Sequence, residues 1–82
     1  MSKDYVLYNL VQAHEALGRL IADMKSNPEY DYGEYSVDVA HVYHHLNTAW
    51  NARDATNAAA DECSEENFYR WHQFPTDIYM GD

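Results

Sequence analysis

The stretch NPEYDYGEYS, residues 27–36, decides the fold because it interrupts an otherwise helical sequence. The residue before Pro28 is disfavoured in helical geometry, so a first helix is predicted to end near that point. Asp31 and Glu34 have the spacing of a capping box, in which the first side chain accepts a hydrogen bond from the backbone of the second. The stretch therefore predicts a turn over 27–34 and a second helix after it, with Ser36 as a competing helix start.

Apolar residues recur at helical spacing on both sides of this turn. Before the turn they predict a helix over about 4–26, with one apolar stripe made of Val6, Leu10, Ala13, Leu17, Leu20, Ile21 and Met24. After the turn they predict a helix over about 35–60, with a stripe made of Val39, Val42, Tyr43, Leu46, Ala49 and Trp50, and with Arg53 at its end. We expect the two stripes to face the core.

Two serines stand where helix starts are expected. Ser2 is the expected N-cap of the first helix, because a serine side chain there can accept from the backbone of the first turn. Ser64 is followed by two glutamates, which the helix dipole favours in a first turn. It predicts a short third helix over about 64–73, which ends before Pro75. Residues 74–82 form the C-terminal tail.

These elements predict an all-α fold: an antiparallel helical hairpin of two long helices plus a short third helix, arranged like a three-helix bundle. At 82 residues the chain is expected to form a single small domain. A chain of this size buries only about 60–65% of the surface that its unfolded form exposes, so its core is thin. We therefore expect oligomerisation, as a dimer, to complete the fold.

Composition narrows the classes of partner. The formal net charge is −9, with 14 acidic residues against 5 basic ones. Nucleic acid and anionic membrane surfaces both require a basic face, so neither is expected as a direct partner. A basic protein surface is expected instead. The single cysteine, Cys63, cannot form an internal disulfide, and no signal peptide or membrane span is visible, so the expected location is the cytoplasm.

The turn alternates acids and aromatics, and the chain contains 8 tyrosines in all. Tyrosine provides a large contact area with few rotatable bonds, which suits a binding surface. We predict a partner-binding surface made of Tyr30, Asp31, Tyr32, Glu34 and Tyr35, together with Tyr8 from the outer face of the first helix. Aromatic rings would contact the partner while carboxylates meet its Arg and Lys side chains. The alternative is a solvated loop whose tyrosines fold back over the helix ends.

Two weaker patterns are candidates for ligand binding. His41 and His45 are four residues apart and share a helix face, so they are candidate ligands for one metal ion. They lack a third and fourth ligand, which a dimer would have to supply, and they lie roughly opposite the predicted apolar stripe. Surface or interface histidines are therefore the favoured interpretation. Trp50, Asn51 and Arg53 are candidates for binding a small polar ligand, or for a hydrogen-bonded seam between helices or protomers.

The sequence contains no catalytic constellation. Its acids are scattered, and no glycine-rich phosphate loop is present, so no enzyme activity and no cofactor are expected. In composition alone the chain resembles the small acidic helical inhibitors and accessory proteins encoded by phages and mobile elements. The leading hypothesis is a non-enzymatic interaction module, an inhibitor or regulatory accessory protein that docks on a basic protein surface. The alternative is a helical homo-oligomer that binds a metal ion or small polar ligand between protomers.

Overall fold

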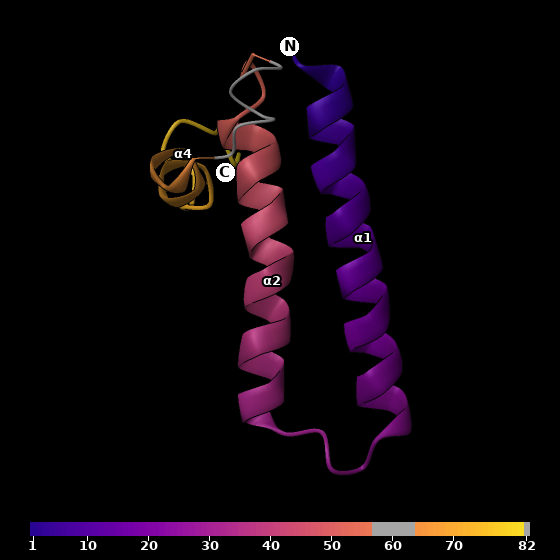
Figure 1. Cartoon of the computed structure of the whole chain (residues 1–82). Helices are drawn as coiled ribbons and strands as arrows, with labels where there is room; N and C mark the ends of the chain where they lie inside the picture. Colours follow the sequence, from indigo (N-terminus) through magenta and orange to yellow (C-terminus); the bar gives the residue numbers. More distant parts are fainter. Residues whose placement is uncertain (57–63, 82) are drawn as a thin grey trace.

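The computed structural model describes residues 1–56 and 64–81, and these form the predicted helical hairpin (Figure 1). Helices α1 (Lys3–Ser26) and α2 (Tyr32–Asn51) lie side by side and antiparallel. A third helix, α4 (Glu65–Trp71), packs against α2 near the open end of the hairpin. The described residues contain no strand. None of the described helices is long and apolar enough to cross a bilayer.

The second helix is capped by the predicted Asp31, but it starts at Tyr32 rather than near residue 35 and is shorter than expected. Oδ1 of Asp31 accepts a hydrogen bond from the backbone N–H of Glu34 at 3.0 Å, so Asp31 is the N-cap. Ser36, the competing start, lies inside α2 and donates to the carbonyl of Gly33 at 2.9 Å. The helix ends at Asn51 rather than near residue 60, and the last predicted helical residues, 57–60, lie outside the described part of the chain.

Ser2 does not cap α1 with its side chain, contrary to the prediction. Its hydroxyl donates instead to the carbonyl of Ala55, and its backbone N–H donates to the carbonyl of Arg53 at 2.5 Å. Ser2 therefore ties the start of α1 to the turn after α2. Ser64 does cap α4, because its hydroxyl accepts from the N–H of Asn67 at 3.2 Å.

The stripe of α1 that faces α2 consists mainly of small residues. Its buried members are Asn9, Ala13, Ala16 and Leu20. Ala13 and Leu20 were predicted to face inward, but the larger members of the predicted stripe lie outside the core: Leu10 is 43% exposed, Leu17 43%, Ile21 44% and Met24 49%. Small side chains at the contact allow two helix axes to approach closely, which explains why this stripe packs inward.

The inward stripe of α2 also differs from the prediction. Val42 and Ala49 are buried as expected, at 6% exposure each. The stripe continues through the half-buried His45, whereas Leu46 is 42% exposed. The expectation that the histidines lie opposite the core was therefore wrong for His45. His45 lies at the helix contact because the small-residue stripe of α1 is the one that packs against α2.

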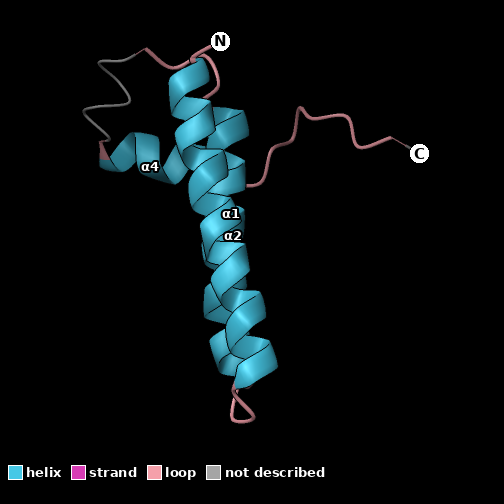
Figure 2. Ribbon diagram, turned by 90° about the vertical axis from the view of Figure 1, so that its right-hand side faces the viewer, coloured by secondary structure: helices cyan, strands magenta, loops and turns pink. Residues whose placement is uncertain are grey.

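The third helix is held by a tryptophan and two asparagines. Trp71 is 5% exposed, and its ring meets the Tyr5 ring of α1 edge-on with centroids 6.0 Å apart. The side-chain amides of Asn47 and Asn51 donate to the carbonyls of His72 and Trp71, each at 2.8 Å. Figure 2 shows α4 on one side of the hairpin and the C-terminal tail extending on the other.

Candidate functional site

The hairpin tip is an ordered turn at the end of the molecule far from α4 (Figure 1). Oδ1 of Asn27 accepts from the N–H of Glu29 at 2.9 Å, and the carbonyl of Asn27 accepts from the N–H of Tyr30 at 3.0 Å. With the Asp31 cap, these bonds fix the backbone on both sides of the turn. The tip therefore presents its side chains from a defined backbone.

The three tyrosines of the tip have different surroundings. The hydroxyl of Tyr30 donates to Oδ2 of Asp38 at 2.9 Å, so this ring folds back over the start of α2. Partial burial, then the hydrogen bond and charge of Asp38, raise the pKa of Tyr30 to about 12. Tyr32 is 83% exposed and Tyr35 is 40% exposed. Tyr30 thus packs back over the helix, as the alternative interpretation of the loop expected, whereas Tyr32 projects into solvent.

Three acidic residues lie close to Tyr32 in the sequence. Glu29, Asp31 and Glu34 are all exposed at the tip. Tyr8, which was grouped with the tip residues as a partner-binding residue, lies near the opposite end of α1. Its ring stacks on Tyr5 with centroids 6.5 Å apart. The structure therefore brings five of the six predicted partner-binding residues together and separates Tyr8 from them.

The histidines of α2 form a cluster with a fourth histidine that the sequence pattern did not include. The ring centroids of His41 and His45 are 4.8 Å apart, and those of His44 and His45 are 4.6 Å apart. His72, after α4, lies 5.8 Å from His44. Partial burial, followed by repulsion from neighbouring imidazoles, lowers the pKa of His45 to about 4. Burial also lowers the pKa of His44.

This cluster does not complete a metal site within the part of the chain that the structure describes. No group of three or more His, Cys, Asp or Glu side chains there is arranged to hold a metal ion. One ring nitrogen of His45 is already used, because Nδ1 lies 3.0 Å from Oδ1 of Asn9. Cys63 lies outside the described residues. The predicted His41–His45 pair is therefore close together but has no third ligand among the described side chains.

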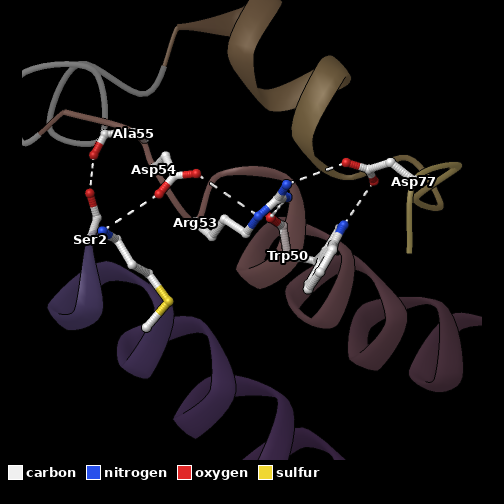
Figure 3. Close-up of polar contacts among 7 residues, drawn as sticks. Ser2, Trp50, Arg53, Asp54, Ala55 and Asp77 are labelled. Atoms are coloured by element: carbon white, nitrogen blue, oxygen red, sulfur yellow. Dashed lines mark hydrogen bonds and ion pairs between the residues drawn. The ribbon is translucent and has the colours of Figure 1, made fainter. Parts of the chain in front are cut away.

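Trp50 and Arg53 hold Asp77 of the C-terminal segment beside α2 (Figure 3). Asn51 donates to the carbonyls of Trp71 and Gln73. The indole N–H of Trp50 donates to Oδ1 of Asp77 at 2.8 Å, and the Arg53 guanidinium contacts Oδ2 of Asp77 at 3.3 Å. The guanidinium also lies 4.2 Å from the centroid of the Trp50 ring. The hydrogen bond from Trp50 is the main reason why the pKa of Asp77 is lowered. These contacts match the predicted alternative, a hydrogen-bonded seam between elements of the chain.

Two hollows lie around α4. The larger, of about 540 Å³, is open and polar, and is lined by Arg53, Asp54, Arg70 and Asp77 among others. The more enclosed hollow, of about 170 Å³, lies between Tyr5, His44, Phe68 and their neighbours. Oδ1 of Asp54 also forms an ion pair with the N-terminal ammonium of Met1, 3.5 Å away (Figure 3). Intrachain pairs therefore already engage several of the charged groups of the larger hollow.

Comparisons with protein-family models, with curated protein sequences and with solved structures give no match to this chain.

Proposed function

We propose that this chain is a non-enzymatic protein-binding module, an inhibitor or regulatory accessory protein, whose acidic hairpin tip docks on a basic surface of a partner protein. The observation that carries the proposal is the position of Tyr32. Its side chain is 83% exposed at the far end of the hairpin and is flanked by exposed Glu29, Asp31 and Glu34. An aromatic ring in this setting is suited to insert into a pocket while carboxylates pair with Arg and Lys around it.

The net charge of −9 supports the same proposal through association kinetics. A strongly acidic chain is attracted over distance to a basic surface, and this attraction weakens as salt is added. The single cysteine fits a partner in the reducing cytoplasm.

The ordered backbone of the tip favours binding as well. The Asp31 cap and the Tyr30–Asp38 hydrogen bond hold the turn before any partner arrives. A loop that is already ordered loses less conformational entropy when it binds, so more of the contact energy appears as affinity. In this arrangement Tyr30 supports the loop, and Tyr32 makes the contact.

The test is affinity capture from host lysate with the chain as bait, at low and at high salt. A specific basic protein should be captured at low salt and released at high salt. The variant Tyr32→Ala should capture much less of it. Tyr79→Ala is the matched control, because Tyr79 is equally exposed, at 83%, but lies in the C-terminal tail. Equal capture by Tyr32→Ala and the native chain would rule out the role given to the tip.

A further inference from the structure

One side of the hairpin is an apolar face that no described helix covers, although Phe74 lines a hollow with Val39 at its edge. We call it the open face; it consists of Val6, Leu10, Leu17, Ile21 and Met24 from α1 and of Tyr35, Val39 and Leu46 from α2. Six of these eight side chains are between 40% and 49% exposed. Among the described residues, by contrast, no large side chain is fully buried. The hairpin thus exposes larger apolar side chains than most of those it buries between its helices, and such patches mark binding surfaces.

Helix geometry places these residues on a single side. In α1, Leu10, Leu17 and Ile21 each follow a buried residue by one position, a rotation of roughly 100° from the inward stripe. In α2, Val39 and Leu46 follow half-buried residues in the same way. Because the helices are antiparallel and face each other, the same rotation leads to the same side of the hairpin. This is the side away from α4, towards which the tail extends (Figure 2).

The open face contains no carboxylate, although the chain carries a net charge of −9. Lys3 and Lys25 continue its α1 stripe at the two ends, seven residues before Leu10 and four after Ile21. A basic partner would find no acid to pair with here, so the open face, although it includes Tyr35, is distinct from Tyr32 and the exposed acids that the proposed function uses. Two copies of the chain, however, can bring these faces together without opposing their acids.

The size of the open face suits a dimer. From Val6 to Met24 it is roughly 27 Å long, and two helices side by side are roughly 20 Å wide, which corresponds to about 500 Å². A standard interface buries about 800 Å² of accessible surface on each partner, and the accessible area of side chains exceeds their projected area. A partner must therefore offer an apolar face about two helices wide and equally long. The open face itself has these dimensions.

We propose that a second copy of this chain covers the open face, giving a two-fold symmetric dimer in which two hairpins form a four-helix arrangement. The C-terminal tail selects the orientation. It extends on the side of the open face, at the end of the hairpin away from the tip (Figure 2). The two hairpins are therefore antiparallel, because a parallel dimer would bring the two tails together at the same end of the interface.

The C-terminal tail is positioned to contribute to this dimer. It extends on the side of the open face (Figure 2). Tyr79 and Met80 of the tail are 83% and 84% exposed. In the antiparallel dimer the tail of each copy starts beside the tip end of the other open face, where Met24 and Tyr35 lie. Tyr79 and Met80 of the tail then have an apolar surface to contact.

Sedimentation velocity of the native chain, from low to high micromolar concentration, tests the dimer. The native chain should sediment as a dimer, with twice the 9.5 kDa mass of one chain. Leu17→Glu should weaken the dimer by about 100-fold or more, because it places a charge in the centre of an apolar interface. Val37→Glu is the matched control: Val37 is 70% exposed on α2 but outside the open face, so this variant should dimerise normally. Circular dichroism confirms that each variant is helical, and Ile21→Glu replaces Leu17→Glu should the latter unfold.

A native chain that stays monomeric throughout, or a folded Leu17→Glu that dimerises like the native chain, would overturn the proposal. The Tyr32→Ala variant separates it from the proposed function, since this variant should lose partner capture and keep the dimer. The orientation is tested by disulfide trapping in a Cys63→Ser background, with Val6→Cys and Met24→Cys chains mixed. The mixed disulfide is expected, and a disulfide between two Met24→Cys chains would contradict the antiparallel arrangement.

Discussion

The imidazole of His45 donates a hydrogen bond to Asn9 across the contact between the two long helices. Nδ1 of His45 lies 3.0 Å from Oδ1 of Asn9, and Nδ2 of Asn9 donates to the carbonyl of Tyr5 at 3.1 Å. Because a carbonyl can only accept, Asn9 points its amide nitrogen at Tyr5 and its oxygen at the histidine. His45 therefore carries a proton on Nδ1, and a polar pair occupies a position where an apolar contact was expected.

Asn9→Ala is expected to destabilise the fold by about 1–3 kcal/mol, because it leaves the Nδ1–H of His45 without its partner at the helix contact. Asn9 is itself only 2% exposed, so the substitution also leaves a small cavity. Urea unfolding followed by circular dichroism measures the change. Gln12→Ala on the same helix is the control and should have a much smaller effect. Similar losses in both variants would contradict the importance of the Asn9–His45 pair.

The stability of the fold should decrease between about pH 6.5 and pH 4. The pKa of His45 is lowered from 6.5 to about 4 in the folded chain, so in this window the unfolded chain binds a proton that the folded chain does not. Protonating the folded state would place a charge in a partly buried position beside His41 and His44, and His72, which follows α4, lies next to His44. We expect the free energy of unfolding to decrease by about 1 kcal/mol between about pH 7.5 and pH 5, after solvent screening is allowed for.

Urea unfolding at a series of pH values measures this slope. His45→Gln should reduce the slope, because it removes the titrating group and keeps a donor for Asn9. The lowered pKa of His44 acts in the same direction, so part of the slope should remain. His14→Gln is the control, since His14 is an exposed residue of α1. A slope that is lost in His14→Gln and kept in His45→Gln would contradict the assignment to the cluster.

Asp31→Ala should destabilise α2 by about 1 kcal/mol, because it removes the acceptor for the N–H of Glu34. Asp31→Asn should restore most of the loss, since the amide oxygen of asparagine accepts the same bond. Urea unfolding measures both variants, and hydrogen exchange of the first amides of α2 reports the local effect. If Asp31→Asn were as damaging as Asp31→Ala, the charge of Asp31 rather than its cap would be the stabilising feature.

Asp77→Ala should release the C-terminal segment while the hairpin stays folded. Asp77 is the acceptor for both Trp50 and Arg53, and its side chain is exposed, so the effect on global stability should be small. The indole N–H resonance of Trp50 should shift and exchange faster with water, and the tail should be cleaved faster by protease. Asp54→Ala is the control, since its carboxylate meets Arg53 at 3.9 Å but does not bind Trp50.

Much of the candidate site was predictable because it is local in the sequence. The Asp31 cap, the turn after Asn27 and the acidic surroundings of Tyr32 all depend on residues within a few positions of one another. The separate roles of Tyr30 and Tyr32 were not predictable, because they depend on whether a ring reaches Asp38 in the next helix. The Trp50–Asp77 contact joins residues 27 positions apart and left no local signal.

The sequence by itself determined the caps of α2 and α4 and the end of α1, because capping side chains and a proline act on their immediate neighbours. It also determined which residues share a stripe, since 3.6 residues make one turn. Only the tertiary structure decided which stripe of each helix packs inward. In α1, a stripe containing Ala13 and Ala16 and a stripe containing Leu10 and Leu17 lie side by side. Helical periodicity is the same for both, and close approach of the two helices selects the smaller residues for the contact.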